Sequence, residues 1–457
     1  MPLTLLSNQF YIILLLTIFC PAIAIGESGD EMLWKAGTAR INITPDESIW
    51  MGGYASRNHP SEGIRQDVWI KAVALEDRSG RKGVLVAMDL VLITKKISDR
   101  IRNQIKNQYG LDKEQIILNV SHTHSGPELN YQEWNMDDKE REKVRSFARE
   151  LESKTVQLVG KALNDLKPAQ LYAGNGLTRF QVNRRNNKEH ELKSYSELKG
   201  PNDYAVPVIK IMDKNNIKAI VFGYACHATV LSDYLISGDY PGYAQKVLEE
   251  KYPGTTALFF QGAGGDQNPL PRREEGLAEQ YGLELSAAVD RVLKREMRPL
   301  SSELVFSYSE IEIGLQKEPL SRKELESIVR DDSYPSYQKQ RVRIVLNKMN
   351  GGVKFPPHYP YPVEVWKVGE QAIFALGGEL LVGYAIELKR IFGDDIFVFG
   401  YCNDVMGYIP TVEVLREGGY EANRAPYLKM YSWEPNIEYL IIKESKILAK
   451  KVGVEMQ

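Results

Sequence analysis

The sequence predicts an α/β protein in which mixed β-sheets are layered with flanking helices. Short, continuous apolar runs bounded by turn residues are typical of buried strands, and they recur along the chain. Between them lie longer segments with the apolar spacing of amphipathic helices, and this alternation is the pattern of layered α/β folds. With 457 residues, 43% of them hydrophobic and 26% charged, the chain has ample material for a core.

Strands and helices begin to alternate near the N-terminus. Four segments of the first 120 residues have the composition of strands: 35–45, 68–75, 82–88 and 116–120. The first alternates apolar and polar residues and ends in Pro45, and the next two are joined by an Asp-Arg-Ser-Gly turn. An amphipathic pattern near 97–109 predicts a helix that leads into the strand at 116–120.

The middle of the chain continues the alternation. A long charged segment at 138–166 predicts a helix, and Asp239 is a candidate N-cap for another that ends near Tyr252. Four further strands are expected: 170–173, 205–212, 217–224 and 255–261. The loop at 183–199 is polar, and no repeat, linker or low-complexity tract interrupts this order.

The C-terminal part begins with a segment of different character. Residues 317–361 are charged and then proline-rich, with a helical pattern near 337–349, and we interpret them as a surface excursion. Strands are then expected at 363–368, 371–376 and 396–401. Helices are expected to begin within 377–383 and to cover 435–452.

The N-terminus has the features of a secretory signal peptide. An apolar run at 12–20 precedes Pro21-Ala22-Ile23-Ala24, which places small residues at positions −3 and −1 of a cleavage point after Ala24. The run is too short to span a bilayer. We therefore expect residues 1–24 to be removed and 31–457 to form one domain. The mature chain is then secreted or periplasmic, without a transmembrane segment.

Charge and cysteine content restrict the function further. A net charge of −2 and a pI near 6.4, with no basic run, argue against a nucleic-acid partner. After signal cleavage two cysteines remain, Cys226 and Cys402. Export permits a disulfide between them, but each lies in or at the end of an apolar run, so two buried free thiols are an equal alternative.

Histidines follow two of the predicted strands. His122 and His124 come directly after 116–120, and His227 follows 217–224. If the first run continues as a strand, the side chains of His122 and His124 point to the same face at its carboxyl end, where α/β proteins place ligand sites. Imidazole is the commonest metal ligand and a general base near neutral pH. A histidine pair that only hydrogen-bonds within a loop is the alternative.

The strand at 255–261 runs into a glycine-rich segment, Gly262-Ala263-Gly264-Gly265-Asp266-Gln267-Asn268-Pro269. A dinucleotide-binding fingerprint needs a third glycine that opens a helix, and Gln267 stands at that position. We therefore reject a dinucleotide cofactor.

Several short motifs together resemble the neutral ceramidase family, the zinc-dependent amidases that cleave the N-acyl bond of ceramide. The motifs are residues 37–45, Met51-Gly52-Gly53-Tyr54, His122-Thr123-His124-Ser125-Gly126-Pro127, Asn183-Arg184, Cys226-His227, Ser237-Gly238-Asp239, Gly378-Glu379, Tyr408-Ile409-Pro410-Thr411 and Tyr420-Glu421-Ala422. The resemblance covers nearly the whole chain after the signal peptide. It implies that residues 31–457 are a catalytic domain of this family.

The resemblance also implies roles for particular residues. One zinc ion would be held by four side chains: His122, His227, Glu379 and Tyr408. Three others would bind the substrate's polar head and the developing oxyanion: His124, Arg184 and Tyr420. Two imidazoles and a carboxylate leave an open position for water, as catalytic zinc requires. For Arg184 the alternative is a solvated loop charge, and for Glu379 it is a favourable charge at a helix start.

The sequence departs from the family pattern in two places. The family motif Gly-Asp-x-Ser-Pro is here Gly265-Asp266-Gln267-Asn268-Pro269, so Asn268 replaces a serine to which a catalytic part is assigned. Longer members also continue into an immunoglobulin-like β-sandwich, whereas this chain has one predicted helix after Trp433. Asn268 cannot act as a nucleophile, although its NH2 group can donate to an oxyanion.

These observations predict a zinc-dependent amidohydrolase that acts on ceramide or a related N-acyl lipid through a zinc-activated water, with Asn268 and His124 as catalytic residues. The substrate is a small molecule or lipid that could be met at a membrane surface. Two alternatives stay open because the serine is absent. One is a zinc hydrolase for another acyl substrate, such as an N-acetyl sugar or an ester. The other is a zinc-containing, non-catalytic protein that binds lipid or glycan.

Overall fold

A computed structural model describes the chain from residue 34 to residue 457. The segments 131–135, 193–196, 317–320, 335, 354–355 and 424–431 lie outside the described residues. So does the predicted signal peptide, residues 1–24, which therefore stays a prediction. Among the described helices, none is both long and apolar enough to cross a membrane.

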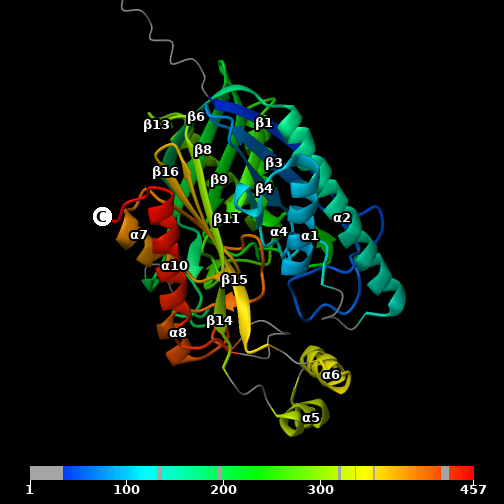
Figure 1. Cartoon of the computed structure of the whole chain (residues 1–457). Coiled ribbons are helices and arrows are strands. Elements are labelled where there is room, and N and C mark those ends of the chain that lie inside the picture. The colour runs from blue at the N-terminus through cyan, green and yellow to red at the C-terminus, as the bar shows by residue number, and fades with distance from the viewer. Residues whose placement is uncertain are drawn as a thin grey trace, which may run out of the picture. The chain divides into compact units, whose positions relative to one another are not determined.

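Two β-sheets form the centre of the described structure (Figure 1). The larger contains, in order, β11 (Thr256–Gln261), β9 (Asn216–Tyr224), β8 (Ala205–Asp213), β6 (Lys167–Leu177), β1 (Trp34–Asn42), β3 (Trp69–Glu76), β4 (Lys82–Met88) and β5 (Ile116–Val120), with β13 (Arg298–Pro299) paired to β6. The smaller contains β14 (Leu304–Gly314), β15 (His358–Val368), β16 (Gln371–Leu376) and β18 (Phe397–Phe399). Both sheets mix parallel and antiparallel pairs, because β4–β5, β9–β11 and β16–β18 are parallel.

The alternation of side chains along the strands explains how the layers pack. In β9, Val221 points into the core between the two sheets, where it joins Trp366 of β15, whereas Ile220 and Phe222 point to the opposite face, which helices cover. Strands that are buried on both faces have continuous apolar sequences. This is why the sequence revealed most strands of the large sheet.

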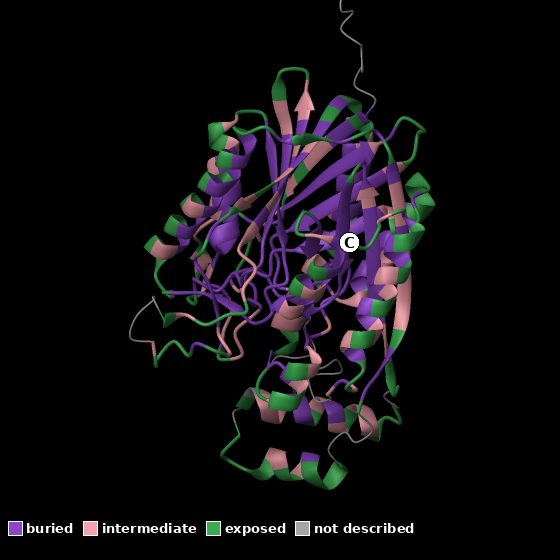
Figure 2. Ribbon diagram, turned by 90° about the vertical axis from the view of Figure 1, so that its left-hand side faces the viewer, coloured by how far each residue is buried: buried purple, intermediate pink, exposed green. Residues whose placement is uncertain are grey.

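Helices cover the outer faces of both sheets. The large sheet is covered by α1 (Lys95–Tyr109), α2 (Asp138–Asn164), α3 (Asp239–Lys251) and α4 (Glu275–Leu293), and the small sheet by α7 (Val382–Phe392) and α10 (Ile437–Lys451). Figure 2 shows these helices with their buried sides toward the sheets and their exposed sides outward. The predicted fold class, layered mixed sheets with flanking helices, is confirmed.

Several short elements complete the fold. They are η1 (Lys113–Gln115), α8 (Val412–Glu417) and three two-stranded pairs: β2 (Gly63–Ile64) with β10 (Leu235–Ile236), β7 (Gln181–Asn183) with β12 (Gln267–Pro269), and β17 (Glu379–Leu380) with β19 (Tyr408–Ile409). The last two pairs carry candidate site residues.

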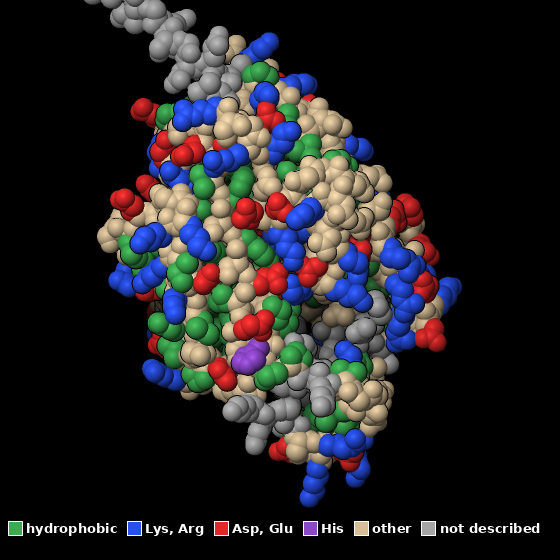
Figure 3. Space-filling model, in the orientation of Figure 1, with side chains coloured by type: hydrophobic (Ala, Val, Ile, Leu, Met, Phe, Trp, Pro, Cys, Tyr) green, Lys and Arg blue, Asp and Glu red, His purple; other side chains and the backbone are tan. Residues whose placement is uncertain are grey.

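Lysine, arginine and acidic side chains are interspersed over the face shown in Figure 3.

Two helices occupy most of the predicted surface excursion. They are α5 (Arg322–Arg330) and α6 (Ser336–Asn350), which lie beyond the ends of β14 and β15 (Figure 1). They share a small core of their own around Leu325, Val342 and Val345. Because β15 begins at His358, the end of the segment 317–361 belongs to the small sheet. The domain limits 31–457 stay a prediction.

Two details of the sequence interpretation are wrong. Asp239 is not an N-cap, because Gly238 holds that position, and Asp239 is the first helical residue, with a φ of 54°. Its carboxylate instead accepts hydrogen bonds from the backbone N–H groups of Leu231 and Tyr240. The helix expected to begin within 377–383 does begin there, at Val382, but Glu379 lies in a strand, so its alternative interpretation as a charge at a helix start is wrong.

The carboxyl ends of four strands meet at one place in the fold. Asn119 of β5 connects them: its side-chain oxygen accepts from Gln261 N–H (2.8 Å), and its amide donates to Gly400 O (2.8 Å) and Gln261 O (3.3 Å). These bonds link β5, β11 and the segment after β18, and β9 is the parallel neighbour of β11. The loops that follow these strands carry most of the candidate site.

Candidate functional site

Two imidazoles converge on one carboxylate oxygen. The Nε2 atoms of His122 and His227 each lie 3.3 Å from Oε2 of Glu379. The Nδ1 atoms face backbone carbonyls, at 2.5 Å from Val91 O and 2.6 Å from Gly264 O. A carbonyl oxygen can only accept, so each Nδ1 carries the proton and donates it. In a neutral imidazole this tautomer leaves the lone pair on Nε2, which is the orientation that metal-binding histidines require.

The backbone turn at His122 explains this convergence. Because β5 ends at Val120, the expectation that His122 and His124 share a strand face is wrong. Instead the chain turns at His122, whose φ of 57° is left-handed, and brings the Nε2 atoms of His122 and His124 to 3.1 Å. His227 is fixed separately, because its N–H donates to Gln267 O (3.0 Å).

His124 is held by the turn at residues 52–57. Arg57 donates to the carbonyl of His124 (2.6 Å), and the Tyr54 ring meets the imidazole edge-on at 4.9 Å. Gly53 lies against this imidazole, since a Cβ at residue 53 would come within 2.5 Å of the ring. Burial, and then the neighbouring His122 and His227, hold the pKa of His124 well below its ordinary value. His124 is therefore neutral at pH 7.

The side chains of Glu379 and Tyr408 reach the site together. The two residues are register partners in the parallel pair β17–β19, so their side chains lie on the same face. Both are almost completely buried, and the Tyr408 ring lies parallel to the His227 imidazole, with centroids 6.4 Å apart. Burial and the Glu379 carboxylate raise the pKa of the Tyr408 phenol well above its ordinary value.

This arrangement fits a metal ion. Ligand atoms of His122, His124 and His227 all lie within 4.8 Å of one another, and these three residues could hold a metal. The Glu379 carboxylate is 4% exposed and lies next to the imidazoles of His122 and His227, where a cation would compensate its charge. Imidazole nitrogens oriented by carbonyls, together with a carboxylate oxygen, are ligands that suit zinc.

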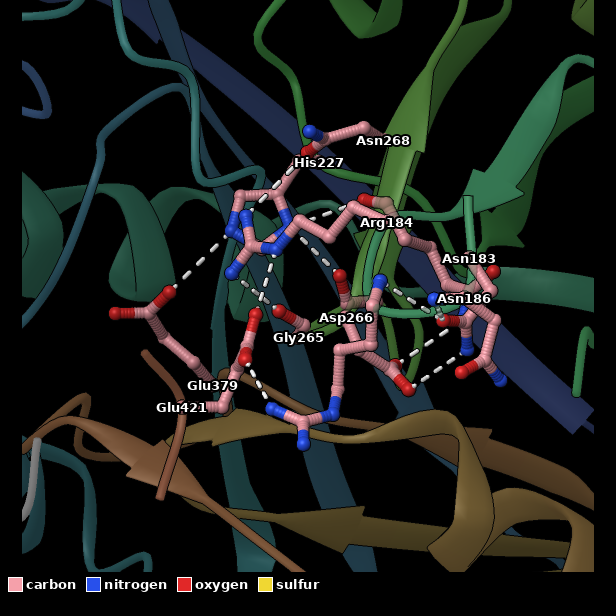
Figure 4. Close-up of polar contacts among 12 residues, drawn as sticks. Asn183, Arg184, Asn186, His227, Gly265, Asp266, Asn268, Glu379 and Glu421 are labelled. Atoms are coloured by element: carbon pink, nitrogen blue, oxygen red, sulfur yellow. Dashed lines mark hydrogen bonds and ion pairs between the residues drawn. The ribbon is translucent and has the colours of Figure 1, made fainter. Parts of the chain in front are cut away.

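Arg184 lies inside the site, so the alternative of a solvated loop charge is wrong. Its Nε donates to Glu421 (2.8 Å), its Nη2 to Gly265 O (2.9 Å) and its Nη1 to Asn268 Oδ1 (3.4 Å), as Figure 4 shows. The rings of Tyr408 and Tyr420 flank the guanidinium at 5.4 and 5.5 Å. Through these three hydrogen bonds the guanidinium connects several loops of the site.

The contacts of Arg184 determine how the Asn268 amide is oriented. An arginine has no acceptor, so the Asn268 atom that faces it is the carbonyl oxygen, and the NH2 group lies on the other side of the amide. Figure 4 shows this nitrogen on the side away from the Arg184 bond. It donates to none of the described residues. Asn268 is held in β12, opposite Val182 of β7, and is 6% exposed.

Sequence reasoning missed the residues that support these groups. Glu421, which is buried, also accepts from Arg185 (2.7 Å), and Arg185 pairs with Glu417 (2.7 Å). Asp266 accepts from Val382 N–H (3.0 Å) and from the Asn183 amide (3.1 Å). The tandem arginines and the Tyr-Glu pair at 420–421 were the available signals. Tyr420 itself lies at the rim and is 51% exposed.

The two cysteines are free and buried. Cys226 precedes His227, and the Sγ of Cys402 accepts from the Asn119 amide (3.3 Å). Of the two alternatives that the sequence left open, the structure therefore shows buried free thiols.

Known proteins resemble this chain in sequence. A family model for the N-terminal part of neutral/alkaline non-lysosomal ceramidases matches residues 34–270. Neutral ceramidase of Pseudomonas aeruginosa is 26% identical over 288 residues, which cover 58% of this chain and 41% of that protein. Neutral ceramidase A of Dictyostelium discoideum is 27% identical over 277 residues, 53% of this chain and 37% of that protein. The matched part thus spans about two fifths of the length of these relatives.

Solved structures resemble the chain over a greater length. The crystal structure of neutral ceramidase from Pseudomonas aeruginosa has a TM-score of 0.72 and covers 94% of this chain and 76% of that chain, at 19% sequence identity. A ceramidase structure complexed with C2 has a TM-score of 0.70, also at 19% identity. At this identity the likeness shows that the fold is shared. Since the family model covers more than half of the 457 residues, the chain belongs to the neutral/alkaline non-lysosomal ceramidase family.

Proposed function

We propose that this protein is a zinc-dependent amidohydrolase that cleaves the N-acyl bond of ceramide or a related N-acyl lipid. The observation that carries the proposal is the convergence of His122 Nε2 and His227 Nε2 on Glu379 Oε2, with Tyr408 in register beside Glu379. Membership of the ceramidase family supports the reaction class. The relatives from Pseudomonas aeruginosa and Dictyostelium discoideum are named as ceramidases.

One zinc ion per chain is assigned to His122, His227, Glu379 and Tyr408. When bound, it polarises the amide carbonyl and lowers the pKa of a water toward ~7. The protein orients the ligands, because the carbonyls of Val91 and Gly264 hold the two imidazoles in the required tautomer.

His124 is assigned to proton transfer. Its imidazole is neutral at pH 7 and lies next to His122, so it can accept the proton that the attacking water loses and donate it to the leaving amine. The turn at 52–57 holds the ring in place through Gly53, Tyr54 and Arg57.

Asn268 is assigned to the tetrahedral oxyanion. Its NH2 group has no acceptor among the described residues, and Arg184 holds the amide in this orientation. An asparagine is no nucleophile, so the reaction proceeds without an acyl-enzyme. One well-placed donor of this kind is worth about 3 to 4 kcal/mol of barrier. Arg184 and Tyr420 also border the place where the substrate's polar head would bind.

The decisive experiment compares substrates under defined metal content. Zinc-loaded protein should release fatty acid from N-acyl lipids, and chelator-treated protein should not. The second candidate function is that of a zinc hydrolase for another acyl substrate, and the presence of Asn268 at the serine position favours it. N-acetyl sugars and esters, tested in parallel, address this candidate. Binding of N-acyl lipid without turnover would contradict the proposed hydrolase activity and would support a non-catalytic lipid-binding protein.

The site is also proposed to work outside the cytoplasm. The apolar run at 12–20 and the small residues before the cleavage point support a secreted or periplasmic mature protein. The N-terminal sequence of protein recovered from the medium or periplasm would test this, with a new terminus at Ile25 as the expected result.

A further inference from the structure

Tyr401 is a buried tyrosine beside the candidate metal centre that has no role in the proposed mechanism. It is 0% exposed and follows β18 in a left-handed turn, with a φ of 57°. Its ring centroid lies 4.6 Å from the His122 imidazole and 6.3 Å from the His227 imidazole. Its backbone N–H donates to Gly378 O (2.9 Å), the residue before Glu379. Tyr401 is thus packed against two of the four proposed ligands and is hydrogen-bonded to the residue before a third.

The Tyr401 hydroxyl is buried and has no hydrogen-bond partner among the described residues. Other buried tyrosines differ in this respect. Tyr384 donates to Pro410 O (3.0 Å), Tyr361 to Gly377 O (2.8 Å) and Tyr240 to Cys226 O (2.6 Å). Leaving a buried hydroxyl unpaired costs free energy comparable to a lost hydrogen bond, so such a group is rare unless something else satisfies it.

The Tyr401 phenol can act as a hydrogen-bond donor. A tyrosine hydroxyl carries its proton at neutral pH. The ring packing on His122 fixes its position, so the donor does not have to be ordered when a ligand enters.

We propose that Tyr401 is a further active-site residue. Its hydroxyl donates a hydrogen bond to an oxygen atom that enters the centre formed by His122, His227 and Glu379, and this oxygen belongs to water or to the scissile acyl group. This inference rests on the proposed function. It adds a second neutral donor to the Asn268 amide, on a different element of the fold. It also explains why an unpaired hydroxyl is kept at a buried position.

The test compares Tyr401→Phe with a matched control, Tyr384→Phe. Both substitutions remove only a buried hydroxyl, but only Tyr384 has a partner in the protein. In metal-free protein, the melting temperature should fall for Tyr384→Phe and should stay the same or rise for Tyr401→Phe. A fall for Tyr401→Phe as large as that of the control would overturn the inference, because it would show that the hydroxyl is paired within the chain.

The second measurement uses zinc and substrate. Zinc should raise the melting temperature of the wild type and of Tyr384→Phe, and it should raise that of Tyr401→Phe by less. Activity on the best N-acyl substrate should fall about tenfold in Tyr401→Phe, the effect of one hydrogen bond in the transition state, and should be unchanged in Tyr384→Phe. A Tyr401→Phe variant that matches the wild type in both respects would reduce Tyr401 to a packing residue.

The same experiment distinguishes this failure from that of the proposed function. If zinc raised the melting temperature of none of the three proteins, the metal centre itself would be wrong, and the inference about Tyr401 would fall with it. If the wild type and Tyr384→Phe responded and Tyr401→Phe responded equally, only the inference about Tyr401 would be overturned.

Discussion

His124 is oriented differently from the other two histidines of the site. Backbone carbonyls accept from Nδ1 of His122 and His227, whereas the buried Nδ1 of His124 has no partner among the described residues. A ligand histidine is usually held through its second nitrogen. This difference supports two ligand histidines and one that transfers protons.

Alanine substitutions test this division of roles. His122→Ala and His227→Ala should lose zinc, and His124→Ala should keep about one zinc per chain and lose activity, because only its proton-transfer role is removed. Metal analysis and kinetics on the purified variants provide the measurement, with His190→Ala, at an exposed position, as the control. Full zinc occupancy in His227→Ala would contradict the ligand assignment. Loss of zinc in His124→Ala as complete as in His122→Ala would mean that the two are reversed.

Asn268 separates this chain from the family pattern and can be tested by side chains of matched size. Asn268→Asp keeps an oxygen that accepts from Arg184 but replaces the NH2 donor by a second acceptor. Both Asn268→Asp and Asn268→Ala should lower kcat by about 10² or more, with zinc content and KM nearly unchanged, since one oxyanion donor is lost. Steady-state kinetics would show this. An unchanged kcat would reduce Asn268 to a turn residue, and a trapped acyl-enzyme would reveal a nucleophile elsewhere.

Arg184 should act partly through Asn268. Arg184→Ala is expected to lower kcat by about 10² or more, because it removes a donor near the oxyanion and frees the Asn268 amide to rotate. In the double variant Arg184→Ala/Asn268→Ala, the rise in activation free energy should then be smaller than the sum of the rises in the two single variants. Additive losses would mean that the two residues act independently. Wild-type kinetics of Arg184→Ala on every active substrate would exclude Arg184 from the reaction.

At the scale of elements, the segment 417–421 is attached to the end of β7 by two arginines. Glu421 accepts from Arg184 and Arg185, whereas Glu417 meets only Arg185 and its side chain is 50% exposed. Glu421→Ala should therefore lower kcat with zinc content retained, because Arg184 loses the acceptor of its Nε. Glu417→Ala is the control and should leave kcat unchanged, as exposed ion pairs contribute little. Kinetics that do not distinguish the two variants would show that this attachment does not position Arg184.

The elements differ in how far the sequence revealed them. Strands such as β4 and β11 are buried on both faces, and their continuous apolar runs predicted them. The strand β14 was missed because polar residues interrupt its apolar ones, and most of its side chains are only half-buried. The helix α4 was missed as well, and Gly276 and Gly282 weaken its helical signal. Two-residue strands such as β17 have no pattern of their own and form only through their partners.

At the scale of the whole molecule, the residues of the site come from segments that are distant in the sequence. Without the resemblance to the family, spacing could place His122, His124 and His227 only after strands. It could not bring Glu379 and Tyr408 to them, because that depends on the pairing of β17 with β19 and on the bonds of Asn119 between strands. Tyr401 has no motif, and its place became apparent only from the packing of its ring.

Gathering neutral histidines in the interior has a consequence for the stability of the metal-free protein. Burial, and then the Arg184 guanidinium, lower the pKa of His227 from 6.5 to about 4, and the pKa of His124 is lowered too. A histidine in the unfolded chain keeps its ordinary pKa near 6.5, so between pH ~6.5 and ~4 the unfolded state binds more protons than the folded state. Stability from this source is therefore complete above pH ~6.5 and is lost as the pH falls toward ~4.

For His227 alone the loss is on the order of 3 kcal/mol over this range. Denaturant unfolding of metal-free protein at pH 7 and pH 4.5 should show a fall in the free energy of unfolding, and His227→Gln should show a smaller fall because it has no imidazole to protonate there. His190→Gln, at an exposed position, should keep the wild-type dependence. Zinc should oppose acid unfolding only while its histidine ligands remain unprotonated, so its stabilisation should also decline through this range. A His227→Gln variant with the full wild-type pH dependence would show that His227 is not the group responsible.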